Sequence, residues 1–428
     1  MENKKRDRLD RLQNLLIVLL SLSAMVLFVI TQSASLGLRW NPDQFAALSD
    51  SAAAAPGESA TLADLAAPIH VAVGSGGSRF GAGYTTTDNT ALSHLYTLMG
   101  SALGSAEERT GCSESAFRAA LARDSIYFDF TAPLPLPVLA DLLGTELLDE
   151  ESHDTGFSAR MLVLSPDNHG VVRLYLRDGG GTCYVSTPVL YTSDLESVSE
   201  RFEPNGAAFA FESGPAYAAL DPYTLVTEQT PVCPELSAAG ALTDKDTLLR
   251  QLGFNPHTPS RYPDADGTDI LLENTRTVRM RTDGTVLYTS DGDPTLSVSA
   301  AGQLPTLVEA ATGTRQLAER LLSEHTGEAQ LYLEQISRTE ETTVVRFGLR
   351  QEGLVIRYAD GSAAAEFTLT GTIVTAFSIH FRQYAATDRV SPLLPLRQVA
   401  AVAAEGTRLT AAYVDDGGVS VSASWLSN

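Results

Sequence analysis

Lysine is nearly absent from this chain, which has only Lys4, Lys5 and Lys245 among 428 residues. Lysine and arginine together number 30 against 52 aspartates and glutamates, so the formal net charge is -22 and the pI is about 4.6. Proteins that bind nucleic acid need clustered basic side chains to neutralise phosphates. The composition therefore argues against nucleic acid as a partner.

Cysteine is also scarce. Cys112, Cys183 and Cys233 are widely spaced, and the chain has no C-x-x-C pair. No spacing of cysteine and histidine matches a zinc site, so the sequence predicts no metal centre. The residues leave two states of the thiols open, which are one disulfide between any two of the three or buried free thiols.

Signatures of catalysis are missing as well. The sequence has no G-x-S-x-G and no H-E-x-x-H motif, and no serine or cysteine lies in a recognisable activating context. The glycine-rich stretch Val71–Gly83 lacks the third glycine of a dinucleotide-binding fingerprint, because Arg79 occupies that position. We therefore expect a strand-to-strand connection there, no cofactor, and a protein that is not an enzyme.

A run of carboxylates at 264–269 raises the question of calcium. Counted from Asp264, the sixth position of an EF-hand loop is Asp269 instead of glycine, and the twelfth is Thr275 instead of glutamate. An Asp-Gly pair between apolar runs is typical of a hairpin turn, because glycine adopts the positive φ that the turn requires. The stretch therefore predicts a turn between two strands.

The most prominent feature that is present is an uncharged, apolar run from Leu12 to Leu38. About 20 residues span a hydrocarbon core of about 30 Å, so we predict a single transmembrane helix at 12–32. A cleaved signal peptide that ends near Ser33-Ala34-Ser35 is the alternative. Basic residues lie mainly before the run, at Lys4, Lys5, Arg6, Arg8 and Arg11. The positive-inside rule then places the tail 1–11 in the cytoplasm and the remainder outside the cell membrane.

Beyond this segment, the composition divides the chain into a linker and three folded parts. Residues 33–66 are rich in alanine, serine and proline, as linkers are. We predict an N-terminal extracytoplasmic α+β domain at 67–232, a middle domain with β-hairpins at 233–300 and a C-terminal α+β domain at 301–428. Because strands mix with a few helices without regular βαβ alternation, the expected fold class is α+β, with small mixed helix and antiparallel-sheet domains.

Two predicted helices begin with capping signals. Ser113 can cap a helix in which Phe117 and Ala120 repeat on one face. Thr306 makes a capping box with Glu309 before a run of leucine and alanine.

Charge on the strand predicted near residue 280 is one-sided. By the period of two, Thr277, Arg279 and Arg281 fall on one face, while Val278 and Met280 fall on the other. The two outward arginines either contact a partner or balance neighbouring carboxylates.

Several features occur in an order that resembles the YycH/YycI family of regulatory proteins. They are the basic N-terminus with one membrane helix, the stretch "GFNPHTPSRYPDADGTDILLENTRTVRMRTDGTVLYTS", the helix that begins "TLVEAA", and "FSIHFRQYAATDRVSPLLPLRQVAAVAA" followed by a closing "VSVSASW". The resemblance is clearest over 245–428. Members are membrane-anchored partners of WalK-type sensor histidine kinases in Gram-positive bacteria.

The resemblance implies an extracytoplasmic regulator of a two-component sensor histidine kinase that controls cell-envelope metabolism by protein contact. A second anchored regulator of the same family is a further implied partner. In the membrane helix, Ser21, Ser23 and Ala24 offer a small-residue surface for close approach of the kinase helices. The alternatives are an extracytoplasmic binding protein for a cell-wall fragment or peptide, and an envelope hydrolase whose site is assembled from scattered residues.

Overall fold

A computed structural model describes residues 69–82, 89–147, 156–227, 230–299, 304–322 and 325–427. All of its described elements belong to one compact unit, Ala60–Asn428. The predicted membrane helix at 12–32, with Ser21, Ser23 and Ala24, lies outside the described residues. Within those residues, no helix has the length and apolar character needed to cross a membrane.

The protein is mostly β-sheet, with 43% strand and 20% helix. The predicted fold class of small α+β domains is therefore wrong, because nearly all of the strands join two large sheets of seven and thirteen strands. The sequence pattern located many single strands correctly but carries no information on which strands pair. Strands from the predicted middle and C-terminal parts share the larger sheet.

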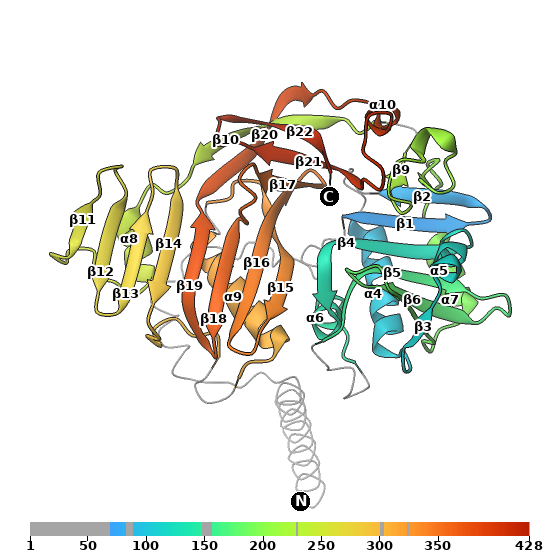
Figure 1. Cartoon of the computed structure of the whole chain (residues 1–428), viewed down its shortest axis with the longest axis horizontal. Helices are drawn as coiled ribbons and strands as arrows, with labels where there is room; N and C mark the ends of the chain where they lie inside the picture. Colours follow the sequence, from blue (N-terminus) through green and yellow to red (C-terminus); the bar gives the residue numbers. More distant parts are fainter. Residues whose placement is uncertain are drawn as a thin grey trace, which may run out of the picture. The chain divides into compact units, whose positions relative to one another are not determined.

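The first sheet contains seven antiparallel strands, shown in blue to green in Figure 1. Their order is β2 (Ser78–Ala82), β1 (His70–Ser75), β4 (Ser125–Pro135), β5 (Ser158–Pro166), β6 (Val172–Arg177), β7 (Cys183–Ser186) and β3 (Thr110–Cys112). The predicted strand-to-strand connection in the glycine-rich stretch is confirmed. Gly76 and Gly77, with φ of 58° and 80°, form the two-residue turn of the β1–β2 hairpin.

Both faces of this sheet are covered. The helices α4 (Asn89–Gly104), α6 (Leu136–Leu142) and α7 (Thr192–Ser199) pack on one face. The other face is covered by α5 (Glu114–Leu121) and by the segment 207–226, which contains β8 (Ala208–Phe209), η2 (Pro215–Tyr217) and β9 (Leu225–Val226). The predicted cap of α5 is confirmed, since the Ser113 hydroxyl accepts a hydrogen bond from the Ala116 N–H at 3.2 Å.

The second sheet contains thirteen strands. Their order is β11 (Arg261–Pro263), β12 (Asp269–Glu273), β13 (Arg276–Met280), β14 (Thr285–Ser290), β19 (Ile373–His380), β18 (Ala365–Thr370), β16 (Thr342–Gln351), β17 (Leu354–Tyr358), β21 (Leu409–Asp415), β22 (Ser420–Ser427), β10 (Cys233–Gly240) and β20 (Arg382–Ser391), while β15 (Gln330–Arg338) pairs with β16. All pairs are antiparallel except β17 with β21. A short helix, α10 (Leu396–Ala400), precedes β21.

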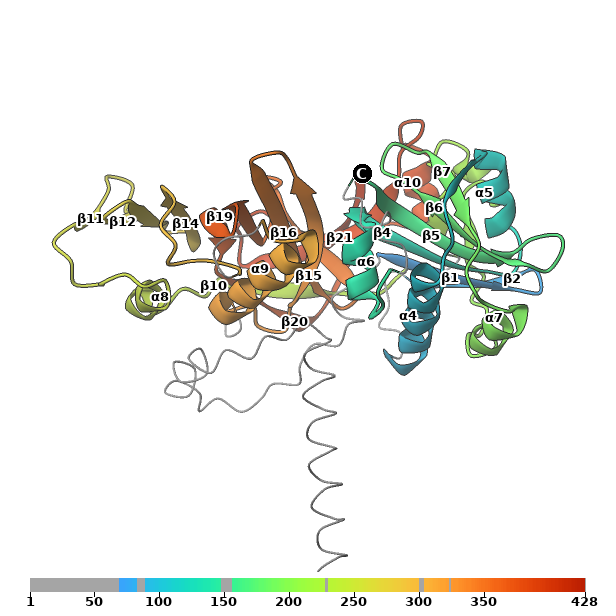
Figure 2. The same ribbon diagram turned by 90° about the horizontal axis from the view of Figure 1, so that it is seen from below.

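Two helices cover one face of the β11 to β16 part of this sheet. They are α8 (Lys245–Gln251) and α9 (Leu307–Leu322), and Figure 2 shows both on the same side of the strands. The predicted capping box of α9 is confirmed, since Thr306 N–H donates to Glu309 at 2.8 Å and Glu309 N–H donates to the Thr306 hydroxyl at 3.1 Å. We call the helix-covered side the inner face.

Candidate functional site

The strand β13 separates two kinds of side chain. Val278 and Met280 are fully buried on the inner face, as the alternation predicts. Arg279 is exposed on the opposite side, and Arg281 is exposed just beyond the end of the strand. The structure therefore places both candidate arginines outward, whereas their contact with a partner stays a prediction.

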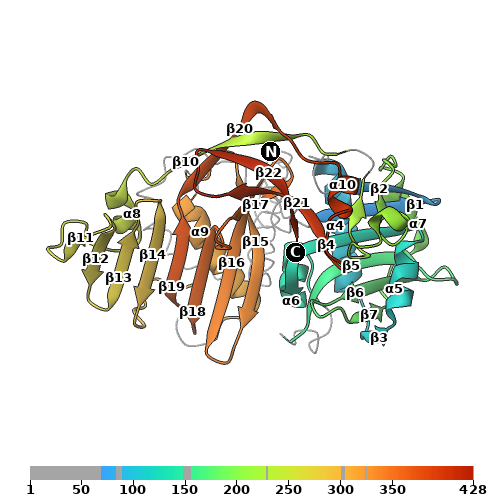
Figure 3. The same ribbon diagram turned by 45° about the horizontal axis from the view of Figure 1, so that its top comes forward.

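The side opposite α8 forms a continuous surface, which we call the outer face. The outward side chains of β11 to β14 that reach solvent there are Tyr262, Leu272, Thr277, Arg279, Arg281, Leu287 and Thr289, while Ile270 and Thr285 point to the same side but are buried. Figure 3 shows these strands side by side with α8 behind them. Tyr262 and Leu272 are 49% and 41% exposed. The two arginines are the only charged members, so the outer face combines apolar and positive groups on a chain with a net charge of -22.

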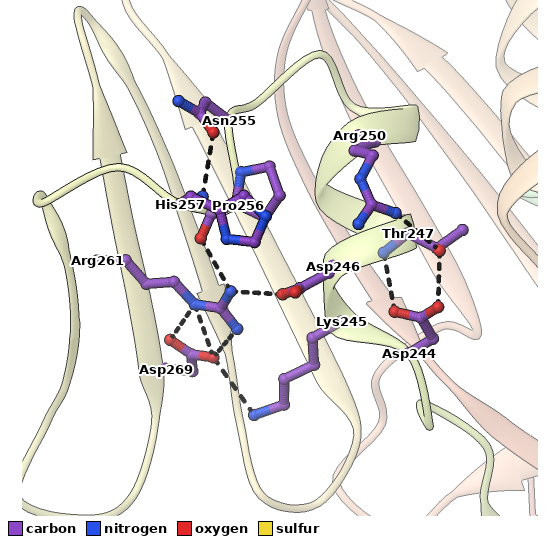
Figure 4. Close-up of polar contacts among 10 residues, drawn as sticks. All are labelled: Asp244, Lys245, Asp246, Thr247, Arg250, Asn255, Pro256, His257, Arg261 and Asp269. Atoms are coloured by element: carbon purple, nitrogen blue, oxygen red, sulfur yellow. Dashed lines mark hydrogen bonds and ion pairs between the residues drawn. The ribbon is translucent and has the colours of Figure 1, made fainter.

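The acidic residues of β12, Asp269 and Glu273, lie on the inner face, where both are paired, and Figure 4 shows the pairing of Asp269. Arg261 on β11 binds Asp269 at 2.7 Å and Asp246 of α8 at 2.5 Å, and it also donates to the carbonyl of Pro256 at 3.2 Å. Lys245 lies 3.7 Å from Asp269. The pKa of Asp269 is lowered, chiefly by its hydrogen bonds from Arg261. Partial burial opposes this shift, and the positive charges of Arg261 and Lys245 add to it.

This inner cluster ties the first turn of α8 to the edge of the sheet. The helix itself is capped by Asp244, whose carboxylate accepts hydrogen bonds from the Thr247 N–H at 2.9 Å and the Thr247 hydroxyl at 2.7 Å. These carboxylates are engaged on the inner side, away from the arginines of the outer face.

The acidic groups close to Arg281 are Asp266 and Asp283 in the adjoining turns. The pKa of Asp266 is lowered, chiefly by its hydrogen bonds from Thr268. Burial alone would raise the pKa of Asp283, but hydrogen bonds from Thr285 lower it, and the positive charge of Arg281 contributes to lowering both pKa values. Among the ion pairs found in the described residues, none joins Arg279 to a carboxylate.

Arg276, the other arginine of β13, has a different environment. It is 5% exposed, and its guanidinium lies over the Phe254 ring at 4.4 Å. It donates to the carbonyls of Leu252 and Gly253 at 3.3 and 3.0 Å, which satisfies acceptors that the end of α8 leaves unpaired. It also pairs with Glu273 at 3.1 Å. Arg276 is thus a structural residue, and sequence reasoning did not distinguish this role.

The edge strand β11 is poorly suited to pair with a further strand. Leu272 N–H donates to the Ser260 carbonyl, and Asp264 N–H donates to the Thr268 carbonyl. Because hydrogen-bonded pairs alternate along an antiparallel ladder, the backbone groups of Arg261 and Pro263 point away from β12. Pro263 has no N–H, and the Arg261 N–H already donates to Thr258 at 3.3 Å. A partner would therefore contact side chains of the outer face instead of extending the sheet.

A second charged cluster lies where the two sheets meet. Asp129 on β4 is fully buried and binds Arg408 at 2.7 Å, while His70 and Arg160 each lie 3.3 Å from its carboxylate. Arg408 also donates to the Tyr127 hydroxyl at 3.1 Å. Burial alone would raise the pKa of Asp129, but Arg408, the His70 hydrogen bond and Arg160 outweigh it and lower the pKa.

This buried cluster supports structure better than chemistry. Asp129, His70 and Arg408 are each at most 5% exposed. No serine, threonine or cysteine is among the three described partners of the carboxylate, which are Arg408, His70 and Arg160. Sequence reasoning missed it, although a signal was present. An aspartate within the apolar run "SIYFDF" needs a buried cationic partner, because an unpaired charge is costly inside a core.

A cavity of about 230 Å³ lies beside the β1–β2 hairpin, lined by Gly77, Ser78, Arg79, Ala122, Arg123, Ala207, Ala208 and Glu212. Its main charged groups already satisfy each other, since Arg79 pairs with Glu212 at 2.5 Å and donates to the Leu121 carbonyl at 2.6 Å. The Arg79 guanidinium also lies over the Phe209 ring at 4.6 Å. The cavity is therefore a weaker candidate site than the outer face.

Comparison with known proteins adds no identification. No family model, no curated protein and no solved structure matches this chain.

Proposed function

We propose that this protein is a membrane-anchored extracytoplasmic regulator that acts by protein contact, and that its outer face binds an acidic surface of a membrane sensor histidine kinase. The observation that carries the contact is the charge of the outer face. Arg279 and Arg281 are its only charged side chains, on a chain whose net charge is -22. The kinase as partner rests on the resemblance of the sequence.

Electrostatic complementarity explains why two arginines matter on such a chain. Most of the surface of this acidic protein repels an acidic partner. A local positive patch therefore orients the partner as it approaches and increases the association rate. A guanidinium can bind a carboxylate through two parallel hydrogen bonds. Tyr262 and Leu272 lie on the same face and supply the apolar contact area that binding surfaces need at their centre.

The predicted membrane segment completes the proposal. Close packing of 12–32 against kinase helices, through Ser21, Ser23 and Ala24, would hold the outer face near the kinase's extracytoplasmic part. Regulation then follows if the bound protein favours one of two kinase arrangements over the other. No chemical step by this chain is required.

Site-specific photocrosslinking in host membranes tests the contact. A crosslinking amino acid replaces Thr289 on the outer face of the full-length chain, and a matched chain carries it at Ser422, an exposed position on β22. We expect a sensor histidine kinase, identified by mass spectrometry, to be captured from position 289 and not from 422. Capture of a cell-wall fragment, or equal capture of the kinase from both positions, would contradict the proposal.

Replacing 12–32 with an unrelated membrane helix separates the two parts of the mechanism. The regulator hypothesis predicts loss of kinase output in a reporter assay, whereas the alternative of a cell-wall binding protein predicts that ligand binding survives the exchange. If kinase output and kinase co-purification both persist, the membrane-helix mechanism is wrong.

A further inference from the structure

Two of the three cysteines lie directly opposite each other at the edge of the seven-stranded sheet. Cys112 on β3 pairs with Cys183 on β7 in the antiparallel register. Opposed residues project to the same face, and Cys183 belongs to the core that contains Phe117 and Tyr223, with the partly buried Cys112 packed against that core. In the structure both are free thiols. They are 71 positions apart in sequence, so spacing alone does not indicate the pair.

The backbone register sets the distance between them. Asp178 N–H donates to the Thr182 carbonyl, which makes those residues a hydrogen-bonded pair of the β6–β7 hairpin. Because the pattern alternates, the N–H and C=O of Cys183 point toward β3, so Cys112 and Cys183 form a hydrogen-bonded pair with Cα atoms about 5.5 Å apart. Disulfides bridge Cα separations of about 4.4–6.8 Å.

The third cysteine has no such partner. Cys233 is buried on β10 of the larger sheet, within a different hydrophobic core. Its thiol lies 3.9 Å from the carbonyl of Pro231.

The surroundings distinguish the two opposed thiols. Arg177 on β6, the neighbour of β7 on the side away from β3, lies directly opposite Cys183. Burial raises the pKa of Cys183, while the positive charge of Arg177 opposes this and favours its thiolate. Cys112 is the more accessible of the two, and burial, with a smaller contribution from Cys183, raises its pKa to about 11.

We propose that Cys112 and Cys183 are a redox pair that oxidises to an intramolecular cross-strand disulfide. The oxidant is a disulfide of low molecular weight, such as glutathione disulfide. The Cys112 thiolate attacks it and releases one thiol, and the Cys183 thiolate then attacks the Cys112 sulfur of the mixed disulfide and releases the second. Two protein thiols are thereby oxidised, one external disulfide is reduced to two thiols, and the two protons of Cys112 and Cys183 pass to the released groups.

The bridge would fix a short element of the fold. The strand β3 has only three residues and lies at the edge of the sheet, paired with β7 alone. It leads through Ser113 directly into α5, whose Phe117 and Leu121 are fully buried. A covalent link at Cys112 would hold the start of α5 on its face of the sheet. This inference does not depend on the proposed regulatory function.

Thiol counting on the full chain tests the proposal. The folded protein is incubated with glutathione disulfide, quenched with acid, unfolded, and its free thiols are counted with a chromogenic reagent. We expect three thiols before incubation and one afterward, with a peptide map that joins Cys112 to Cys183. The matched control Cys233→Ser should lose both of its two thiols, whereas Cys112→Ser should form no intramolecular bridge. Three remaining thiols, a bridge to Cys233, or stable glutathione adducts would overturn the proposal.

The pH dependence of oxidation provides a second readout on the unmodified protein. Only the thiolate attacks. At pH values below a pKa of about 11, the fraction of Cys112 present as thiolate rises roughly tenfold for each unit by which the pH increases. The rate of thiol loss should therefore rise about tenfold between pH 7 and pH 8, and again to pH 9. A rate that does not change with pH would contradict attack by Cys112.

Discussion

The seven-stranded sheet and the β11–β14 end of the larger sheet differ in how their faces are covered. In β4, the neighbouring residues Tyr127 and Phe128 point to opposite faces and both are almost fully buried. In β13, Val278 is fully buried while its neighbour Arg279 is exposed. A strand buried on both sides serves the stability of the fold, whereas a strand with one open face can also bind. The outer face is therefore the better candidate for a binding surface.

The largest expected effect comes from the covered region. Arg408→Leu removes the main partner of the buried Asp129 carboxylate, and we expect a loss of about 3 kcal/mol in the free energy of unfolding, the low end of the range for a broken buried pair. His70 and Arg160 remain beside the carboxylate and limit the loss. Denaturant unfolding measures it.

A double variant provides the control for this pair. Asp129→Leu combined with Arg408→Leu leaves neither charge buried alone, so it should be more stable than Arg408→Leu. The single variant Asp129→Leu is measured as well. If the double variant loses as much free energy of unfolding as Asp129→Leu and Arg408→Leu lose in sum, the ion pair does not link the sheets as described.

The next comparison uses the two sides of β13. Met280→Ala removes a fully buried side chain and should cost about 2 kcal/mol in the free energy of unfolding, the low end of the range for such a change, while Arg279→Ala on the outer face should change it by less than about 0.5 kcal/mol. Urea unfolding of both variants under the same conditions measures the contrast. Equal losses would show that the outer face is also part of a core.

Acid should weaken the covered region through Asp129. Its pKa is lowered in the folded protein, because Arg408, the His70 hydrogen bond and Arg160 together outweigh the opposing effect of burial. A lowered carboxyl pKa contributes stability that is fully present above the unfolded value of about 3.9 and is lost as the pH falls through the folded value. Unfolding from pH 7 to pH 2 should therefore show a steeper loss below pH 4 for the wild type than for the Asp129→Leu/Arg408→Leu variant. Parallel curves would contradict this assignment.

The smallest expected effect concerns the helix that covers the second face of the seven-stranded sheet. Ser113→Ala removes the hydroxyl that caps α5 and should cost about 1 kcal/mol in the free energy of unfolding. Ser113→Asp keeps an acceptor at the cap and should retain most of the stability. An unchanged Ser113→Ala protein would mean that packing of Phe117 alone fixes the helix.

Local structure was predictable from the sequence to a useful extent. The alternation around Val278 and Met280 and the Asp-Gly turn between β11 and β12 were recoverable because each depends on neighbouring residues. In that turn, Gly267 has a φ of 85° and the Asp264 N–H donates to the Thr268 carbonyl. The cap at Ser113 was predictable for the same reason.

Long-range pairing was not predictable. A single strand-like stretch at 372–384 divides at Phe381 into β19 and β20, which occupy distant positions in the strand order of the larger sheet. The strand at 233–240 was missed because its alanines and serines carry little alternation, yet it pairs with β20 and β22. The partner of Asp129 is 279 residues away, so its identity could come only from the fold.

The central claim is tested most directly by the affinity of the full-length chain, reconstituted in nanodiscs, for the kinase identified by crosslinking. Charge reversal by Arg279→Glu with Arg281→Glu is compared with Arg397→Glu, which reverses an exposed arginine on α10. We predict that the double reversal raises the dissociation constant at least about tenfold, an energy of about 1.4 kcal/mol, with no change in the free energy of unfolding. Arg397→Glu should bind as the wild type does. Wild-type affinity in the double variant would contradict the claim that the outer face is the contact surface.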